Sequence, residues 1–152
     1  MLQYDGKCYY FYNIQKGFED ARSMCKDLGF GYAELMSGHI YEPKKETNFK
    51  ILSWESWNGK FGFGRNDYTS WLGIKKQETW KPEIGKYSQK FVYASDNITL
   101  NTNLLNSLWG CGQPNSKIHS LDCVVYDQSD FWLTTKCDEK HRFVCEFYLK
   151  GI

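Results

Sequence analysis

Six cysteines constrain this chain more than any other feature of its 152 residues. They are scattered along the sequence, at Cys8, Cys25, Cys111, Cys123, Cys137 and Cys145. No two of them form a CxxC pair, and none stands at a zinc-site spacing from a histidine. An even, scattered set is typical of a disulfide framework formed in an oxidising compartment, so we expect a disulfide-stapled extracellular fold.

We expect no signal peptide in the first residues given, because Met1 is followed directly by Leu2 and Gln3 without an apolar stretch. The cysteines indicate an oxidising compartment, whereas the start of the chain shows no secretion signal. Both observations fit if the chain is one domain of a longer secreted or membrane-anchored precursor. The sequon Asn97-Ile98-Thr99 agrees with an extracellular setting. Asn97 is therefore a candidate glycosylation site.

Length and charge exclude several classes of function. A chain of 152 residues suits one domain with a real core, so we expect a single domain over residues 1–152. The 19 basic and 18 acidic residues form no polyanion-binding stripe, which argues against nucleic acid as a partner. No run of about 18 apolar residues exists, so we expect no membrane insertion by this segment. His39, His119 and His141 stand apart and outside any catalytic motif, so we expect no enzyme activity.

The pattern of apolar residues predicts an α+β fold. Residues 7–12 read as a first strand, and apolar positions at Phe18, Ala21, Cys25 and Leu28 predict a helix over residues 17–28. A proline in the first turn indicates a second helix from about residue 42 to residue 54. Residues 57–121 read as a long irregular region that holds only short apolar pieces. Three strands are expected to close the chain, at residues 123–127, 131–134 and 142–148.

A series of short motifs occurs in a characteristic order over nearly the whole chain. They are Tyr9-Tyr10-Phe11, the helix from Ala21 to Gly29, Trp71-Leu72-Gly73-Ile74, Trp109-Gly110-Cys111-Gly112-Gln113-Pro114-Asn115, Asp122-Cys123, Trp132, Cys137 and Phe143-Val144-Cys145-Glu146. In this order and spacing they resemble the C-type lectin-like domain family. The resemblance implies a C-type lectin-like fold, in which two helices flank small antiparallel sheets that carry a long irregular loop.

The resemblance also implies two disulfide bridges, Cys25–Cys145 and Cys123–Cys137. The first would close a loop of roughly 120 residues, nominally worth about 4–5 kcal/mol of stability. Cys8 and Cys111 remain, with three alternatives open. They can pair with each other or with another chain, as in a homodimer, or the partner of Cys8 can lie outside this sequence. Two free thiols are less expected in an oxidising compartment.

Members of this family that bind sugar do so through a calcium ion on the long loop, and that site is degraded here. Calcium needs about 6–8 oxygen ligands, several of them carboxylates. Gln113 and Asn115 occupy the first two ligand positions, and both are uncharged amides. Leu121, Leu133 and Thr134 occupy the other three, where one acid and an Asn-Asp pair are expected. We therefore expect no cofactor and no calcium at the usual site.

Among acids near this loop, Asp122 matches an auxiliary calcium position of some relatives, which leaves Gln113, Asn115 and Asp122 as weak candidates for a metal. We expect Asp122 to be a solvated or capping residue instead.

The aromatic residues of the irregular region allow two interpretations. Aromatic faces stack on sugar rings and anchor protein interfaces, but they also fill cores. A structural role is favoured for Trp71, Trp109 and Trp132, which match structural positions of the family. It is favoured less strongly for a second set, Trp54, Trp57 and Trp80.

Three binding functions follow from the resemblance. The first is recognition of a glycan with weak or no calcium dependence, through Gln113, Asn115 and Trp109. The second is recognition of a cell-surface or secreted protein, as in receptor-type or venom-type domains. The third is a structural or ice-binding role. The retained Gln113-Pro114-Asn115 motif supports the first, and the lost ligands favour the second.

Overall fold

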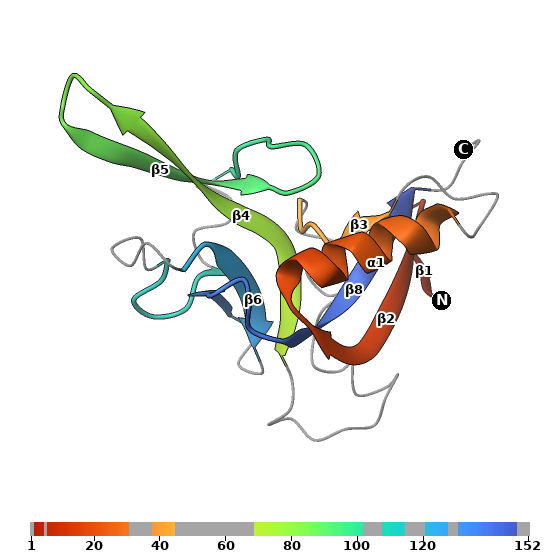
Figure 1. Ribbon diagram of the computed structural model, residues 1–152. Helices are drawn as coiled ribbons and strands as arrows, with labels where there is room; N and C mark the ends of the chain where they lie inside the picture. The colour runs from red at the N-terminus through yellow and green to blue at the C-terminus, as the bar shows by residue number, and fades with distance from the viewer. Residues whose placement is uncertain are drawn as a thin grey trace.

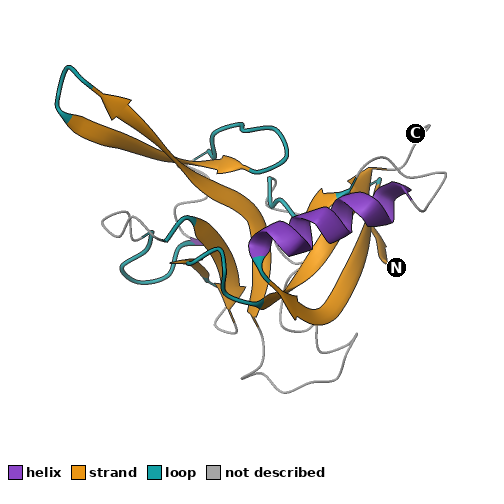
Figure 2. Cartoon of the chain, viewed as in Figure 1, coloured by secondary structure: helices purple, strands orange, loops and turns teal. Residues whose placement is uncertain are grey.

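The computed structural model describes residues 2–4, 6–30, 38–44, 69–101, 108–114, 121–127 and 131–148. One helix and eight strands lie within these residues (Figure 1, Figure 2). In chain order they are β1 (Leu2–Tyr4), β2 (Lys7–Lys16), α1 (Phe18–Phe30), β3 (His39–Ile40), β4 (Thr69–Lys81), β5 (Lys86–Tyr93), β6 (Cys123–Asp127), β7 (Trp132–Thr135) and β8 (His141–Tyr148). The α+β class is confirmed. No helix in this described part is long and apolar enough to cross a membrane.

The strands form one mixed sheet, where small antiparallel sheets were expected. Its order is β1-β2-β8-β4-β6-β7, with β3 paired to β8 and β5 paired to β4. Neighbouring strands are antiparallel except β4 and β8, which run parallel through the pairs Ser70↔Arg142 and Trp71↔Phe143. This pairing joins the first and last parts of the chain to its middle, so β8 and β4 form the centre of the molecule.

Helix α1 covers one face of the sheet, as Figure 2 shows. Phe18, Ala21 and Cys25 are fully buried on its inner side, as the helical spacing predicted. Glu19 and Asp20 stand in the first turn, where acidic side chains interact favourably with the helix dipole. The Phe18 amide donates to the carbonyl of Cys137, which joins the start of the helix to the loop before β8.

The sheet separates two hydrophobic clusters. Alternating residues of one strand point to opposite faces, so Trp71 belongs to the cluster under α1 and Leu72 to the other. Val125 and Val124 divide in the same way on β6. The second cluster includes Trp132 and packs against the long loop, and it therefore gives that loop a rigid base.

Two disulfides staple these layers. Cys25–Cys145 joins α1 to β8 across 120 residues, and Cys123–Cys137 joins β6 to the loop before β8. Both pairings are those that the family resemblance implied. Cys8 and Cys111 form no bridge with each other, because Cys8 is buried in the core under α1 while Cys111 is exposed on the long loop.

The structure differs from two predictions, the second helix from about residue 42 and the irregular region over residues 57–121. Glu42, Pro43 and Lys44 are not helical, and residues 45–54 lie outside the described residues. Within the supposedly irregular region, β4 and β5 form a long antiparallel ribbon instead, which projects away from the body (Figure 1). Its outer half is mostly polar apart from the exposed Trp80 and Tyr87, so it lacks the alternation of apolar residues that identifies a half-buried strand.

Candidate functional site

The described part of the long loop, residues 108–114, is anchored on Trp132. The Trp109 ring lies 5.2 Å from Phe91 and 5.5 Å from Trp132, measured between centroids. The Gly110 amide donates to the carbonyl of Trp132 at 2.9 Å. A Cβ on Gly110 would lie 2.9 Å from Leu133 Cδ2, so a larger residue at this position would require the Leu133 side chain to shift. Trp109 is half-buried by these contacts and has the packing role that the sequence favoured.

Gln113 is held at the end of this loop by Thr134 on β7. Its side-chain oxygen accepts hydrogen bonds from the Thr134 amide at 3.0 Å and from the Thr134 hydroxyl at 2.8 Å. The backbone amide of Gln113 donates to the Gly110 carbonyl at 3.0 Å. The Gln113–Pro114 peptide bond is cis. Two of the five positions at which relatives bind calcium are thus bonded to each other.

The donor set at these positions does not fit calcium. Leu121 and Leu133 supply no side-chain oxygen, and Leu133 packs toward Gly110 and the core. The Gln113 carboxamide oxygen already accepts two hydrogen bonds from Thr134. Asn115 lies outside the described residues. A cation that prefers several carboxylates therefore finds none at the four described positions.

Asp122, the auxiliary candidate, faces a lysine. Its carboxylate lies 3.3 Å from Lys76 Nζ, and that nitrogen is also 3.6 Å from Glu78. The Lys76 side chain is fully buried, so Asp122 and Glu78 balance a charge that is shielded from water. Asp122 is about half exposed, but its charge serves this ion pair.

The remaining predicted positions fall in different places. Asn97 is exposed in a left-handed conformation with φ of 60°, and its side chain accepts a hydrogen bond from Gln77. This exposure is compatible with glycosylation. Trp80 fills no core, since half of its side-chain surface is exposed on the ribbon. Trp54, Trp57 and His119 lie outside the described residues.

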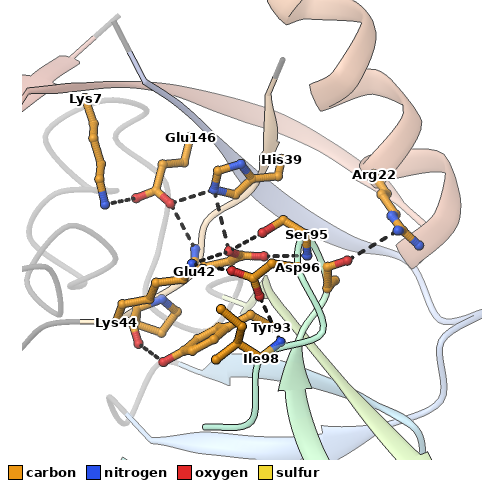
Figure 3. A network of polar contacts seen from close by, with 12 residues as sticks. Lys7, Arg22, His39, Glu42, Lys44, Tyr93, Ser95, Asp96, Ile98 and Glu146 are labelled. Carbon is orange, nitrogen blue, oxygen red and sulfur yellow. Dashed lines mark hydrogen bonds and ion pairs between the residues drawn. The ribbon is translucent and has the colours of Figure 1, made fainter. Parts of the chain in front are cut away.

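A buried acidic network beside α1 was not predicted from the sequence (Figure 3). The fully buried Glu42 accepts hydrogen bonds from the Ser95 amide at 2.8 Å and from the Ser95 hydroxyl at 2.7 Å. Lys44 Nζ lies 3.4 Å from Glu42 and 3.0 Å from Asp96. Burial raises the pKa of Tyr93 to about 12, so its hydroxyl stays protonated and donates to the Pro43 carbonyl. The network fixes residues 94–98 onto β3 and its continuation.

His39 joins Glu42 to a second buried acid. Its Nε2 is 2.8 Å from Glu146 Oε1 and 3.8 Å from Glu42 Oε1, while Lys7 Nζ lies 3.7 Å from Glu146 Oε2. Burial alone would raise the pKa of Glu146. The hydrogen bond from His39 and the positive charges of His39 and Lys7 outweigh burial and hold that pKa below its usual range.

A cavity of about 280 Å³ adjoins this network, between α1, β3 and residues 94–95. His39, Glu42 and Ser95 line it on one side and Arg22 and Lys26 on the other. Both carboxylate oxygens of Glu42 are already engaged by Ser95. The cluster therefore joins elements of the fold rather than presenting a catalytic group.

Comparisons with known proteins agree with this fold. The family model described as the lectin C-type domain matches residues 14–147. Collectin-10 of Xenopus tropicalis is 29% identical over 146 residues, covering 96% of this chain and 44% of that protein. A phospholipase A2 inhibitor of Protobothrops flavoviridis is 48% identical over 40 residues, 26% of each chain. The aligned segments thus span less than half the length of either curated relative.

Among solved structures, the mouse scavenger receptor C-type lectin carbohydrate-recognition domain has a TM-score of 0.66. The match covers 98% of this chain and 95% of that one, at 22% sequence identity. At this identity the likeness concerns the fold alone.

Proposed function

Because this chain belongs to the C-type lectin domain family, we propose that it is an extracellular recognition domain, without enzyme activity, that binds its ligand without calcium. The bond between Gln113 and Thr134 carries this proposal. In a calcium-dependent site the ion holds the ligand side chains in place, and here two hydrogen bonds from β7 hold Gln113 instead. The loop is therefore ordered by protein contacts that do not require a metal.

Carbohydrate is the ligand class that we propose for this surface. The chain keeps the Gln113-Pro114-Asn115 motif of the family's sugar site, although the charged ligands are lost. The mouse scavenger receptor domain, which shares the fold, is a carbohydrate-recognition domain. Amide groups hydrogen-bond sugar hydroxyls without a metal, so the retained side chains suit weak, calcium-independent binding.

A glycan array probed with calcium and again with EDTA tests both parts of the proposal. We expect the same glycans to be bound in both conditions, and the unfolding temperature to be the same with calcium and with EDTA. Gln113→Ala should weaken the glycan signal because it removes the amide from the proposed surface. Ile14→Ser, an exposed change on β2, is the matched control and should leave the signal intact. A signal that disappears in EDTA would contradict calcium independence.

A protein ligand is the second candidate function, and the packing of Trp109 favours it. That ring contacts Phe91 and Trp132, which leaves it only partly available as a platform for a sugar ring. One relative is named as an inhibitor of phospholipase A2, a protein target. An empty glycan array in both conditions, together with saturable binding of purified phospholipase A2 to the immobilised domain, would favour this function over the first.

A further inference from the structure

The outer half of the β4–β5 ribbon has no covering layer within the described residues. Strand β4 pairs with β6 and β8 only up to Lys75, and from Lys76 to Lys81 the strand that pairs with it is β5. Residues 78–80 and 82–88 are exposed. Figure 1 shows this ribbon extending away from the rest of the molecule. Its tip can therefore reach a surface that the body does not touch.

This tip concentrates exposed apolar side chains. Ile84, Tyr87 and Trp80 are 61%, 55% and 51% exposed, and they are three of the four most exposed large apolar residues in the described part of the chain. Trp80 and Tyr87 are paired across the ribbon with ring centroids 5.1 Å apart. Ile84 lies beyond them, in the turn that joins the two strands.

The tip also carries a pair of like charges. Lys81 stands opposite Lys86 in the register, an arrangement that is unfavourable in a hairpin unless an anion lies nearby. The exposed Glu83 in the turn offsets one of these charges. The Lys81 carbonyl accepts hydrogen bonds from the Ile84 and Gly85 amides, so the turn is a closed structure that presents these side chains in fixed order.

We propose that the tip of the β4–β5 ribbon docks on the surface of an anionic phospholipid bilayer. Ile84 enters the boundary of the acyl chains, and Trp80 and Tyr87 lie at headgroup level, where amphipathic rings are favoured. Lys81 and Lys86 pair with anionic headgroups. Because Ile84 lies in the turn beyond the aromatic pair, it is the side chain placed to enter furthest, within the depth of about 5–10 Å to which interfacial elements insert.

The same features fit other partners less well. A sugar has no surface that favours the aliphatic Ile84 at the apex of the turn. A protein interface of standard size buries about 800 Å² on each partner, and a two-stranded tip that projects alone offers little such area. The docking is peripheral and does not depend on the proposed glycan site.

Flotation with vesicles tests the proposal on the full chain. We expect binding to vesicles of phosphatidylcholine with about one third phosphatidylserine, and much weaker binding to phosphatidylcholine alone. Ile84→Ser should weaken the binding about ten-fold, because an aliphatic side chain no longer leaves water. The double change Lys81→Gln with Lys86→Gln should weaken it about 25-fold, at roughly 1 kcal/mol for each lysine. Glu83→Gln should strengthen it about five-fold by the same measure, a gain that misfolding cannot produce.

Matched controls carry the same changes away from the tip of the ribbon. Ile98→Ser alters a side chain that is 59% exposed, and Lys136→Gln with Lys140→Gln removes two exposed lysines near β7. These variants should float like the unmodified protein. No flotation of the unmodified protein, or equal losses in the controls, would overturn the proposal. A tip variant that lowers glycan or phospholipase A2 binding while flotation stays unchanged would place a different partner at the tip and also overturn it. Because the vesicles contain no sugar, this result is independent of the glycan array.

Discussion

Replacement of Glu42 by alanine tests the idea that the buried network holds residues 94–98 in place. The carboxylate of Glu42 is fully buried and accepts two short hydrogen bonds from Ser95. The change Glu42→Ala leaves both Ser95 donors without this acceptor and removes a negative charge from beside Lys44 and His39. The expected result is a loss of global stability together with local opening of the segment that follows β5.

The size of the loss follows from these contacts. A hydrogen bond to a charged group contributes about 1.5–3 kcal/mol, and the exposed Ser95 can regain part of this from water. The lower value of about 1.5 kcal/mol therefore applies to each of the two hydrogen bonds from Ser95 to Glu42, so the expected loss of stability is about 3 kcal/mol. Lys44 is partly exposed and also paired with Asp96, so its contribution is screened and small. For a domain of this size the expected fall in unfolding temperature is about 6–12 °C.

Thermal and urea unfolding of a matched series measure the effect. Ser95→Ala removes only the hydroxyl bond and should cost about 1.5 kcal/mol, while Glu42→Gln keeps an acceptor and should fall between Ser95→Ala and Glu42→Ala. In the Glu42→Ala variant, the rate of amide hydrogen exchange should rise more at residues 95–98 than at the residues of β8. The reasoning is refuted if Glu42→Ala lowers stability by less than about 1 kcal/mol, or if Ser95→Ala costs as much as Glu42→Ala.

Two further predictions concern pH and thiols. The folded-state pKa of Glu146 is lowered, so its contribution to stability is present above the unfolded value of 4.5 and is lost as pH falls through the folded pKa. Glu146→Gln should therefore reduce the slope of the unfolding free energy against pH below about 4.5. An unchanged slope would contradict the lowered pKa of Glu146. Native protein should react with iodoacetamide at the exposed Cys111 but not at the buried Cys8, which should react only in denaturant. Rapid labelling of Cys8 in the native protein, found by peptide mapping, would contradict its burial.

Local motifs predicted much of the fold because they depend on residue type and spacing. The apolar spacing of Phe18, Ala21 and Cys25 identified the helix, and the order of the cysteines implied both bridges through the family resemblance. The β4–β5 ribbon was not recognised. Its outer half is built from residues such as Lys76, Gln77 and Glu78, which are common in loops. Backbone pairing with β5 stabilises this half of the strand without a buried apolar face, and no local sequence pattern predicts that pairing.

The candidate site divides in the same way. Leu121, Leu133 and Thr134 can be read directly from the sequence, so the loss of calcium ligands is a property of residue identity alone. That Gln113 bonds Thr134 across 21 residues, Ser95 bonds Glu42 across 53 and His39 contacts Glu146 across 107 depends on how the strands come together. Hydrogen bonds and ion pairs act only over a few ångströms, so these contacts exist only once the mixed sheet has brought distant segments side by side. The sequence alone therefore determined the family and the degraded metal site, and the tertiary structure decided what holds the loop and which side chains remain exposed.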